Sequence, residues 1–231
     1  MIKAIAFDAD DTLWHNEQHF QDTQQRLSEI LERHADHDLV QAQLENIERR
    51  NIKLFGYGIK GFTLSMIETA IEISNQRINA AEIHEIVLLG KAMLENPMTI
   101  FDGVEAVLQE LGRNYPLLLI TKGDLLDQRN KIERSGLARH FQHLDVVAEK
   151  NPQTYREILD REGLQPENLL MVGNSVPSDI LPVLHLGGHA VHIPYHLTAV
   201  FERHEEEPTC PRFCRLDQIS QLPALVRRLS A

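Results

Sequence analysis

The feature that most constrains this chain is an alternation of short apolar runs with helical patterns, which fills its second half. The apolar runs predict strands at residues 2–7, 117–120, 144–147, 169–172 and 190–193. Helices are predicted between them at residues 104–111, 125–135, 155–162 and 178–186. Strands that alternate with helices are typical of a parallel sheet covered on both faces. The sequence therefore predicts an α/β fold with a doubly wound, Rossmann-like parallel sheet.

Residues 17–96 interrupt this alternation, because they contain no strong strand signal. Leu27, Ile30 and Leu31 follow helical spacing, and a glycine-rich segment at 55–61 is predicted to be a loop between helices. We therefore expect a core of residues 1–15 and 98–231, with an α-helical cap of residues 16–97 inserted after the first strand. A cap at this position is expected to act as a lid that excludes water and selects substrates.

Composition narrows the class of protein. The net charge of -11 argues against a nucleic-acid partner, which requires clustered Lys and Arg. No apolar stretch reaches the length of a membrane span, and no signal-peptide pattern precedes the first strand, so we expect no membrane partner. The two cysteines, Cys210 and Cys214, are too few for a disulfide framework, and with His204 they lack a fourth zinc ligand. We expect a cytoplasmic enzyme, monomeric or homodimeric.

Two carboxylates two residues apart, Asp8 and Asp10, follow the first strand in the segment Asp8-Ala9-Asp10-Asp11-Thr12-Leu13. Like charges at the end of a buried strand repel each other, and a desolvated carboxylate is costly without a partner. A hard divalent cation removes this cost, since Mg²⁺ prefers oxygen ligands. The segment therefore predicts a Mg²⁺ site at the edge of the sheet where open α/β folds bind ligands.

The other strand ends carry polar groups that are expected to converge on the same edge. Thr121 follows the second predicted strand, Lys150 the third, and Asn174 and Asp179 the fourth. In this order, with Asp8 and Asp10, the set resembles the four motifs of the haloacid dehalogenase superfamily, most of whose members are Mg²⁺-dependent phosphatases. Taken singly, Asp10 is equally compatible with a turn or a helix cap, and Thr12 is as compatible with fixing the turn as with binding substrate. Alone, Thr121 favours a strand-end cap, Lys150 a solvated surface position and Asn174 a turn.

The resemblance implies a role for each residue. Asp8 would be the nucleophile that forms an aspartyl-phosphate, and Asp10 would protonate the leaving group and then deprotonate the attacking water. The implied phosphate-binding groups are Thr121, the amides of Lys122 and Gly123, and Lys150, which would also stabilise the charge of Asp8. The implied Mg²⁺ ligands are Asp8, the backbone carbonyl of Asp10, and Asn174 and Asp179, directly or through water.

Two positions depart from the family pattern. Asn174 stands where Asp is common, so we expect weaker metal affinity or a larger share of the metal charge on Asp179. Lys122 stands where many relatives have Asn, and we favour a solvent-facing side chain over one that adds positive charge near the phosphate.

The expected function is hydrolysis of a small phosphorylated metabolite. A sugar phosphomutase shares the motifs and the cap, and a non-catalytic binder of a phosphorylated ligand is the alternative that Asn174 suggests. Dehalogenation is disfavoured, because the dehalogenase branch lacks the second aspartate that stands here as Asp10. The sequence leaves the physiological substrate and the oligomeric state open.

Overall fold

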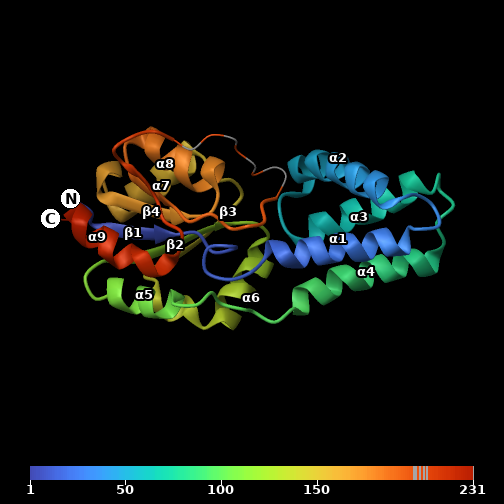
Figure 1. The fold of residues 1–231 in the computed structure, drawn as a ribbon, viewed down its shortest axis with the longest axis horizontal. Coiled ribbons are helices and arrows are strands. Elements are labelled where there is room, and N and C mark those ends of the chain that lie inside the picture. Colours follow the sequence, from blue (N-terminus) through green and yellow to red (C-terminus); the bar gives the residue numbers. More distant parts are fainter. Residues whose placement is uncertain (200–201, 203, 205, 207, 231) are drawn as a thin grey trace. The chain divides into compact units, whose positions relative to one another are not determined.

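The structure, a computed structural model, describes residues 1–199, 202, 204, 206 and 208–230 (Figure 1). The chain divides into two compact units. One unit comprises Met1–His15 with Met98–Ala231, and the other comprises Asn16–Pro97. Among the described residues, no helix is both long and apolar enough to cross a membrane.

The described residues of the first unit contain six parallel strands. They are β1 (Ala4–Phe7), β2 (Leu117–Lys122), β3 (His143–Val147), β4 (Leu169–Gly173), β5 (His189–His192) and β6 (Phe213–Arg215). Their order across the sheet is β3-β2-β1-β4-β5-β6. The predicted doubly wound parallel sheet is confirmed. Strand β6 was not predicted, because three residues are too short to produce a recognisable apolar run.

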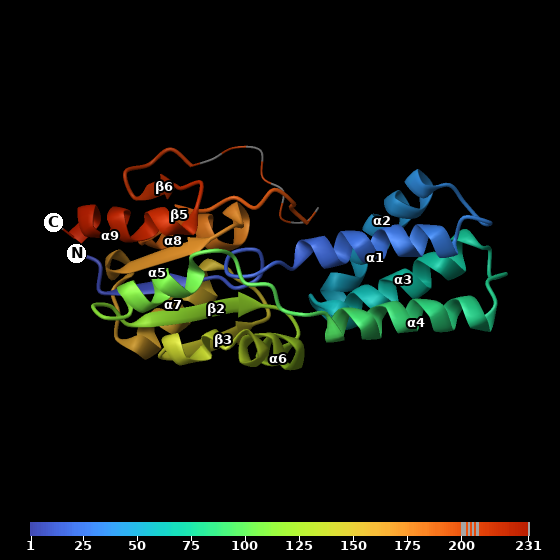
Figure 2. The same ribbon diagram turned by 60° about the horizontal axis from the view of Figure 1, so that its bottom comes forward.

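Helices cover both faces of this sheet (Figures 1 and 2). They are α5 (Val104–Leu111), α6 (Leu125–Ser135), α7 (Pro152–Glu162), α8 (Leu181–Leu186) and α9 (Leu222–Ser230). Shorter helical turns lie at Leu137–His140, Pro166–Asn168, Val176–Ile180 and Ile219–Gln221, of which Val176–Ile180 is a π-helical turn. Helix α9 was also missed by the sequence analysis.

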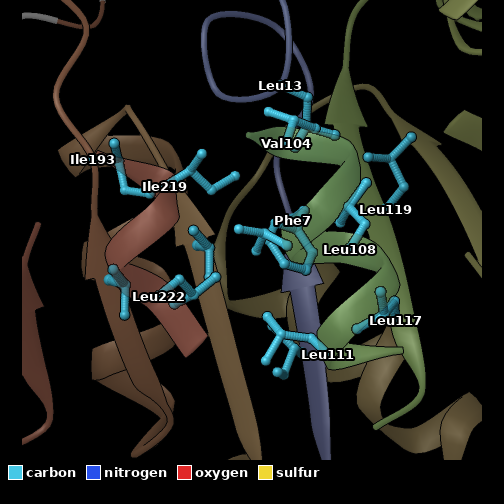
Figure 3. Close-up of a cluster of buried hydrophobic side chains, with 14 of the residues drawn as sticks. Phe7, Leu13, Val104, Leu108, Leu111, Leu117, Leu119, Ile193, Ile219 and Leu222 are labelled. Atoms are coloured by element: carbon cyan, nitrogen blue, oxygen red, sulfur yellow. The ribbon is translucent and has the colours of Figure 1, made fainter. Parts of the chain in front are cut away.

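Alternate residues of β1 point to opposite faces of the sheet, as strand geometry requires. Ile5 and Phe7 pack with side chains of α5 and α9 in one hydrophobic cluster, part of which Figure 3 shows. Ala4 and Ala6 pack with side chains of α7 and α8 in a second cluster. Because β1 is buried on both faces, the residue that follows it, Asp8, is held on a rigid support.

The second unit is helical. It contains α1 (Glu17–Ile30), α2 (His37–Phe55), α3 (Ile59–Ile73) and α4 (Ala80–Glu95), which share one hydrophobic cluster. The predicted loop at 55–61 is shorter than expected, because Phe55 still belongs to α2, and α3 already begins at Ile59.

The order of the strands defines the position of the site. Strand β1 lies between β2 and β4. Strands β2 and β3 lie on one side of β1, and the chain then crosses to the other side, where β4, β5 and β6 lie. Ligands of open α/β sheets bind at this switch point, outside the carboxyl ends of the strands. Asp8 after β1, Thr121 in β2 and Asn174 after β4 all lie at that edge.

Candidate active site

Asp8 is a buried carboxylate with a partner on each of its oxygens. Its Oδ1 accepts a hydrogen bond from the Lys150 ammonium, and its Oδ2 accepts one from the Thr12 hydroxyl at 2.9 Å. The Asp8 amide donates to the carbonyl of Val172 on β4 at 2.9 Å, which fixes the backbone at this point. Thr12 therefore belongs to the turn and also contacts the expected nucleophile directly.

Lys150 bridges two carboxylates that share its single positive charge. Its ammonium also donates to Asp179 Oδ1 at 2.7 Å, and all three side chains are buried. Burial raises the pKa of Asp8 to about 7; Lys150 opposes this effect and Asp179 adds to it. Burial alone would lower the pKa of Lys150, but the two carboxylates hold it well above its ordinary value. When both carboxylates are ionised, the cluster carries one more buried negative charge than its lysine neutralises, which is the state that the raised pKa of Asp8 disfavours.

Asn174 faces a group of acceptors. Its side-chain amide nitrogen lies 3.1 Å from Asp8 Oδ2, 3.2 Å from Thr12 Oγ1 and 3.3 Å from the Asp10 carbonyl oxygen, and its two protons are shared among these three acceptors. This orientation follows from the network, because the Thr12 hydroxyl already gives its proton to Asp8 and can only accept from Asn174. Asn174 thereby supplies a donor to a group of oxygens in which the Thr12 hydroxyl is already engaged with Asp8.

Asp10 lies in a different environment, with donors on every side. Its Oδ1 accepts from the Trp14 indole at 2.7 Å, its Oδ2 accepts from the Gln128 amide at 2.8 Å, and the Lys131 ammonium donates to both oxygens at 2.8 and 2.7 Å. Burial alone would raise the pKa of Asp10, but Lys131 and the two neutral donors hold it below its ordinary value.

A tight turn after β1 makes these two environments possible. The amide of Leu13 donates to the carbonyl of Ala9 at 2.8 Å, and the amide of Asp11 donates to the carbonyl of Trp14 at 2.8 Å. Asp11 adopts a left-handed conformation with a φ of 60°, which aspartate tolerates better than most residues. The turn brings the Trp14 indole back onto Asp10.

The residues after β2 only partly follow the expectations. Thr121 is buried at the expected strand end. The Gly123 amide, expected to bind phosphate, donates instead to the carbonyl of Val147 at 3.3 Å, so this assignment is not supported. The expectation of a solvent-facing Lys122 is wrong. Its side chain is 14% exposed, forms an ion pair with Glu202, and donates to Ser178 at 2.9 Å.

Asp179 occupies the π-helical turn, and its carboxylate is engaged in the structure. Its Oδ2 accepts from the Ser175 amide at 3.0 Å, while Oδ1 receives Lys150. Within the described part of the chain, no three Asp, Glu, His or Cys side chains lie close enough together to hold a metal ion. The groups that converge are instead the Asp8 carboxylate, the Asp10 backbone carbonyl and the Asn174 side-chain amide, only one of which is an acidic side chain.

Two further site residues, Gln128 and Lys131, were missed by the sequence analysis. Both lie on α6 and are buried, three residues apart and therefore on one face of the helix. Helix α6 has few apolar residues, so its buried face could not be recognised from hydrophobic periodicity. The sequence did predict a helix at 125–135 that covers the sheet. Polar residues on the face of such a helix that packs on the sheet are the feature that could have indicated these two site residues.

Comparison with known proteins identifies the family. The model of the haloacid dehalogenase-like hydrolases matches residues 2–187. This chain is a haloacid dehalogenase-like hydrolase. A crystal structure of a haloacid dehalogenase-like family hydrolase from Xanthomonas campestris is 42% identical, with a TM-score of 0.89, and the match covers 99% of this chain and 91% of that one.

Two curated relatives of this haloacid dehalogenase-like hydrolase are named as phosphatases. The N-acylneuraminate-9-phosphatase of Rattus norvegicus is 33% identical over 108 residues, which cover 45% of this chain and 44% of the rat protein. The match therefore spans less than half of that relative. The glyceraldehyde 3-phosphate phosphatase of Methanothermobacter thermautotrophicus is 27% identical over 98% of this chain and 100% of its own length.

The residues present fit a Mg²⁺ ion, which the family implies. Mg–O distances of 2.0–2.1 Å in an octahedral shell place neighbouring ligand oxygens about 2.9 Å apart. The Asn174 amide lies 3.1 Å from Asp8 Oδ2 and 3.3 Å from the Asp10 carbonyl, close to that spacing. Rotation of this amide by half a turn presents its oxygen to the same position. The excess negative charge shared by Asp8 and Asp179 is the charge that a cation would offset.

Proposed function

We propose that this hydrolase is a Mg²⁺-dependent phosphatase of small phosphorylated metabolites that works through an aspartyl-phosphate on Asp8. The observation that carries the proposal is the contrast between the two carboxylates that follow β1. Asp8 shares one lysine with Asp179 and lies beside the oxygens suited to a cation, whereas Asp10 has its own set of donors. A nucleophile and a separate acid–base group need this division. The phosphatase names of two curated relatives support the same reaction.

In the first step, an Asp8 oxygen attacks the phosphorus atom of a phosphate monoester. The P–O bond to the leaving alcohol breaks, and Asp10, which must first take up a proton against the opposing charge of Lys131, gives that proton to the departing oxygen. Lys150 offsets the negative charge of Asp8 and of the phosphoryl oxygens, and the Thr121 hydroxyl donates a hydrogen bond to one of them. Thr12 and Lys150 keep Asp8 in position for the attack.

In the second step, a water molecule attacks the phosphorus of the aspartyl-phosphate. Asp10, now a carboxylate, takes a proton from that water, the P–O bond to Asp8 breaks, and inorganic phosphate leaves. Both carboxylates thereby return to their starting states.

When bound, Mg²⁺ would be held by Asp8, the Asp10 carbonyl and Asn174, and it would offset the negative charge of the nucleophile and of the substrate. Asp179 keeps Lys150 in place through Oδ1, and its proposed contact with the ion is through water.

If residues 16–97 act as a cap, as we propose, they limit the substrates to small metabolites, since a closing lid excludes large phosphorylated partners. We propose that the protein acts in the cytoplasm on such metabolites.

The test is phosphate release from p-nitrophenyl phosphate and from a panel of sugar phosphates, with Mg²⁺ and with chelator, by the wild type and by Asp8→Asn. The proposal predicts Mg²⁺-dependent release that Asp8→Asn abolishes. Release that survives this substitution contradicts it. Isomerised sugar phosphate with little free phosphate would indicate a mutase. Tight binding of phosphorylated ligands without turnover would indicate a binding protein. Chloride released from 2-chloropropionate would indicate a dehalogenase.

A further inference from the structure

The most unusual polar contact of the site lies outside the residues that the family motifs supply. Helix α6 directs both Gln128 and Lys131 at Asp10. The Lys131 ammonium spans the two carboxylate oxygens, and its side chain is only 11% exposed. It also lies 3.9 Å from the carboxylate of Asp127 on the same helix. A lysine with this little exposure is rarely placed without a function or a firm partner.

The hydrogen bond from Gln128 to Asp10 comes with a cost in folding free energy, so a contribution to stability does not explain it. Its Nε2 group donates to Asp10 at 2.8 Å and to the Lys122 carbonyl at 3.2 Å, so both amide protons are used. Its Oε1 is buried and has no hydrogen-bond partner among the described residues. An unsatisfied buried acceptor costs ~1–3 kcal/mol. An apolar side chain at this position would avoid this cost, which indicates that the contact with Asp10 is the purpose of the residue.

The donors around Asp10 fix the orientation of its carboxylate. A carboxylate offers about four lone-pair positions. One Trp14 bond, one Gln128 bond and two Lys131 contacts fill that number. Trp14 and Gln128 are almost fully buried, so they hold one position on each oxygen permanently. Lys131 is the donor that a water molecule can replace on one oxygen while it keeps its contact with the other.

We propose that Lys131 and Gln128 are positioning residues that orient Asp10 toward the water of the second step, the hydrolysis of the aspartyl-phosphate. This inference rests on the proposed function. The water gives its proton to the oxygen position that Lys131 vacates, and its oxygen forms the new bond to phosphorus as the bond to Asp8 breaks. The first step is less dependent on this orientation when the leaving group is good, because such a group departs without a proton.

This difference provides a test by rapid mixing with p-nitrophenyl phosphate, whose p-nitrophenolate is a good leaving group. In Lys131→Met we expect p-nitrophenolate release in a burst that approaches one equivalent per site. A steady state at least tenfold slower than that of the wild type should follow. Acid-quenched protein should carry a phosphoryl group on Asp8. Lys131→Arg should restore most of the steady-state rate, since it keeps a cation that can contact both oxygens.

Two further variants keep the test decisive. Gln128→Met should show the same burst with a smaller loss of steady-state rate, and it carries the test if Lys131→Met does not fold. Arg129→Met is the matched control, because Arg129 is an exposed cation on the same helix, and it should behave as the wild type. Equal slowing of burst and steady state, without a phosphorylated intermediate, overturns the inference. A wild type that releases no phosphate overturns the proposed function itself, and the inference with it.

Discussion

The contact of Asn174 with Asp8 and Asp10 makes Asn174→Asp the most informative substitution at this site. The Asn174 amide nitrogen donates to Asp8 Oδ2 at 3.1 Å. An aspartate at the same position places a second carboxylate against Asp8. Two unit charges at that separation repel each other by ~5 kcal/mol at an effective dielectric constant of 20. Protonation of one carboxylate offers an escape, so the expected loss of unfolding free energy is about 2–4 kcal/mol.

The measurement is thermal unfolding of Asn174→Asp and of the wild type, each in chelator and in saturating Mg²⁺. For a chain of this size, 1 kcal/mol corresponds to roughly 2–4 °C, so we expect the variant to melt about 5–15 °C below the wild type in chelator. Mg²⁺ should remove most of the difference, because the cation attracts the added charge. By the same argument, the variant should bind Mg²⁺ at least tenfold more tightly than the wild type in calorimetric titration.

The matched control is Asn114→Asp, which adds the same charge at an exposed position and should change the melting temperature little. If Asn174→Asp melts with the wild type in chelator and gains no more from Mg²⁺, the convergence of Asn174 on Asp8 and Asp10 is refuted.

Three further substitutions test other parts of the structure. Lys150→Met leaves the carboxylates of Asp8 and Asp179 buried without their cation. It should lower the free energy of unfolding by about 3–5 kcal/mol in chemical denaturation and abolish turnover. Retained activity would contradict the role of this lysine. Gly173→Ala places a Cβ atom 2.2 Å from Asp179 Oδ2. It should lower the free energy of unfolding by about 1–3 kcal/mol in the same assay, and it should lower turnover. Full activity would show that Asp179 need not stay in place. Burial and its neighbour Glu45 raise the pKa of Glu48 to about 7, so the folded state binds its proton more tightly than the unfolded chain. The wild type should lose stability between about pH 4.5 and pH 7 as this proton leaves, and Glu48→Gln should become relatively more stable over that range, by up to about 3 kcal/mol. A constant difference between the two proteins across that range would contradict this reasoning.

The parts of the fold that the sequence predicted are those in which one pattern decides the structure. Short apolar runs such as 169–172 predicted buried strands, and their alternation with helices predicted a parallel sheet. The short strand β6 and helix α9 were missed. Their segments acquire a partner only when the sheet is already present, and this information is not local in the sequence.

The candidate site shows the same limit. The order of polar residues at the strand ends predicted that Asp8, Lys150 and Asp179 would meet, and the structure brings them together. Which way Lys122 points could not be deduced, because it depends on Glu202, a residue eighty positions further along the chain. The donors to Asp10 come from the inward face of a mostly polar helix, where hydrophobic periodicity gives no indication of burial.

The proposed covalent chemistry can be tested most directly by finding the intermediate. The protein would be mixed with substrate and Mg²⁺, quenched with acid within the first turnover, digested, and analysed by mass spectrometry. The account predicts that the peptide containing Asp8 gains the mass of one phosphoryl group and that Asp8→Asn shows no such gain. Complete turnover with no phosphoryl group on that peptide at any quench time, in the wild type and in Lys131→Met alike, would contradict the account.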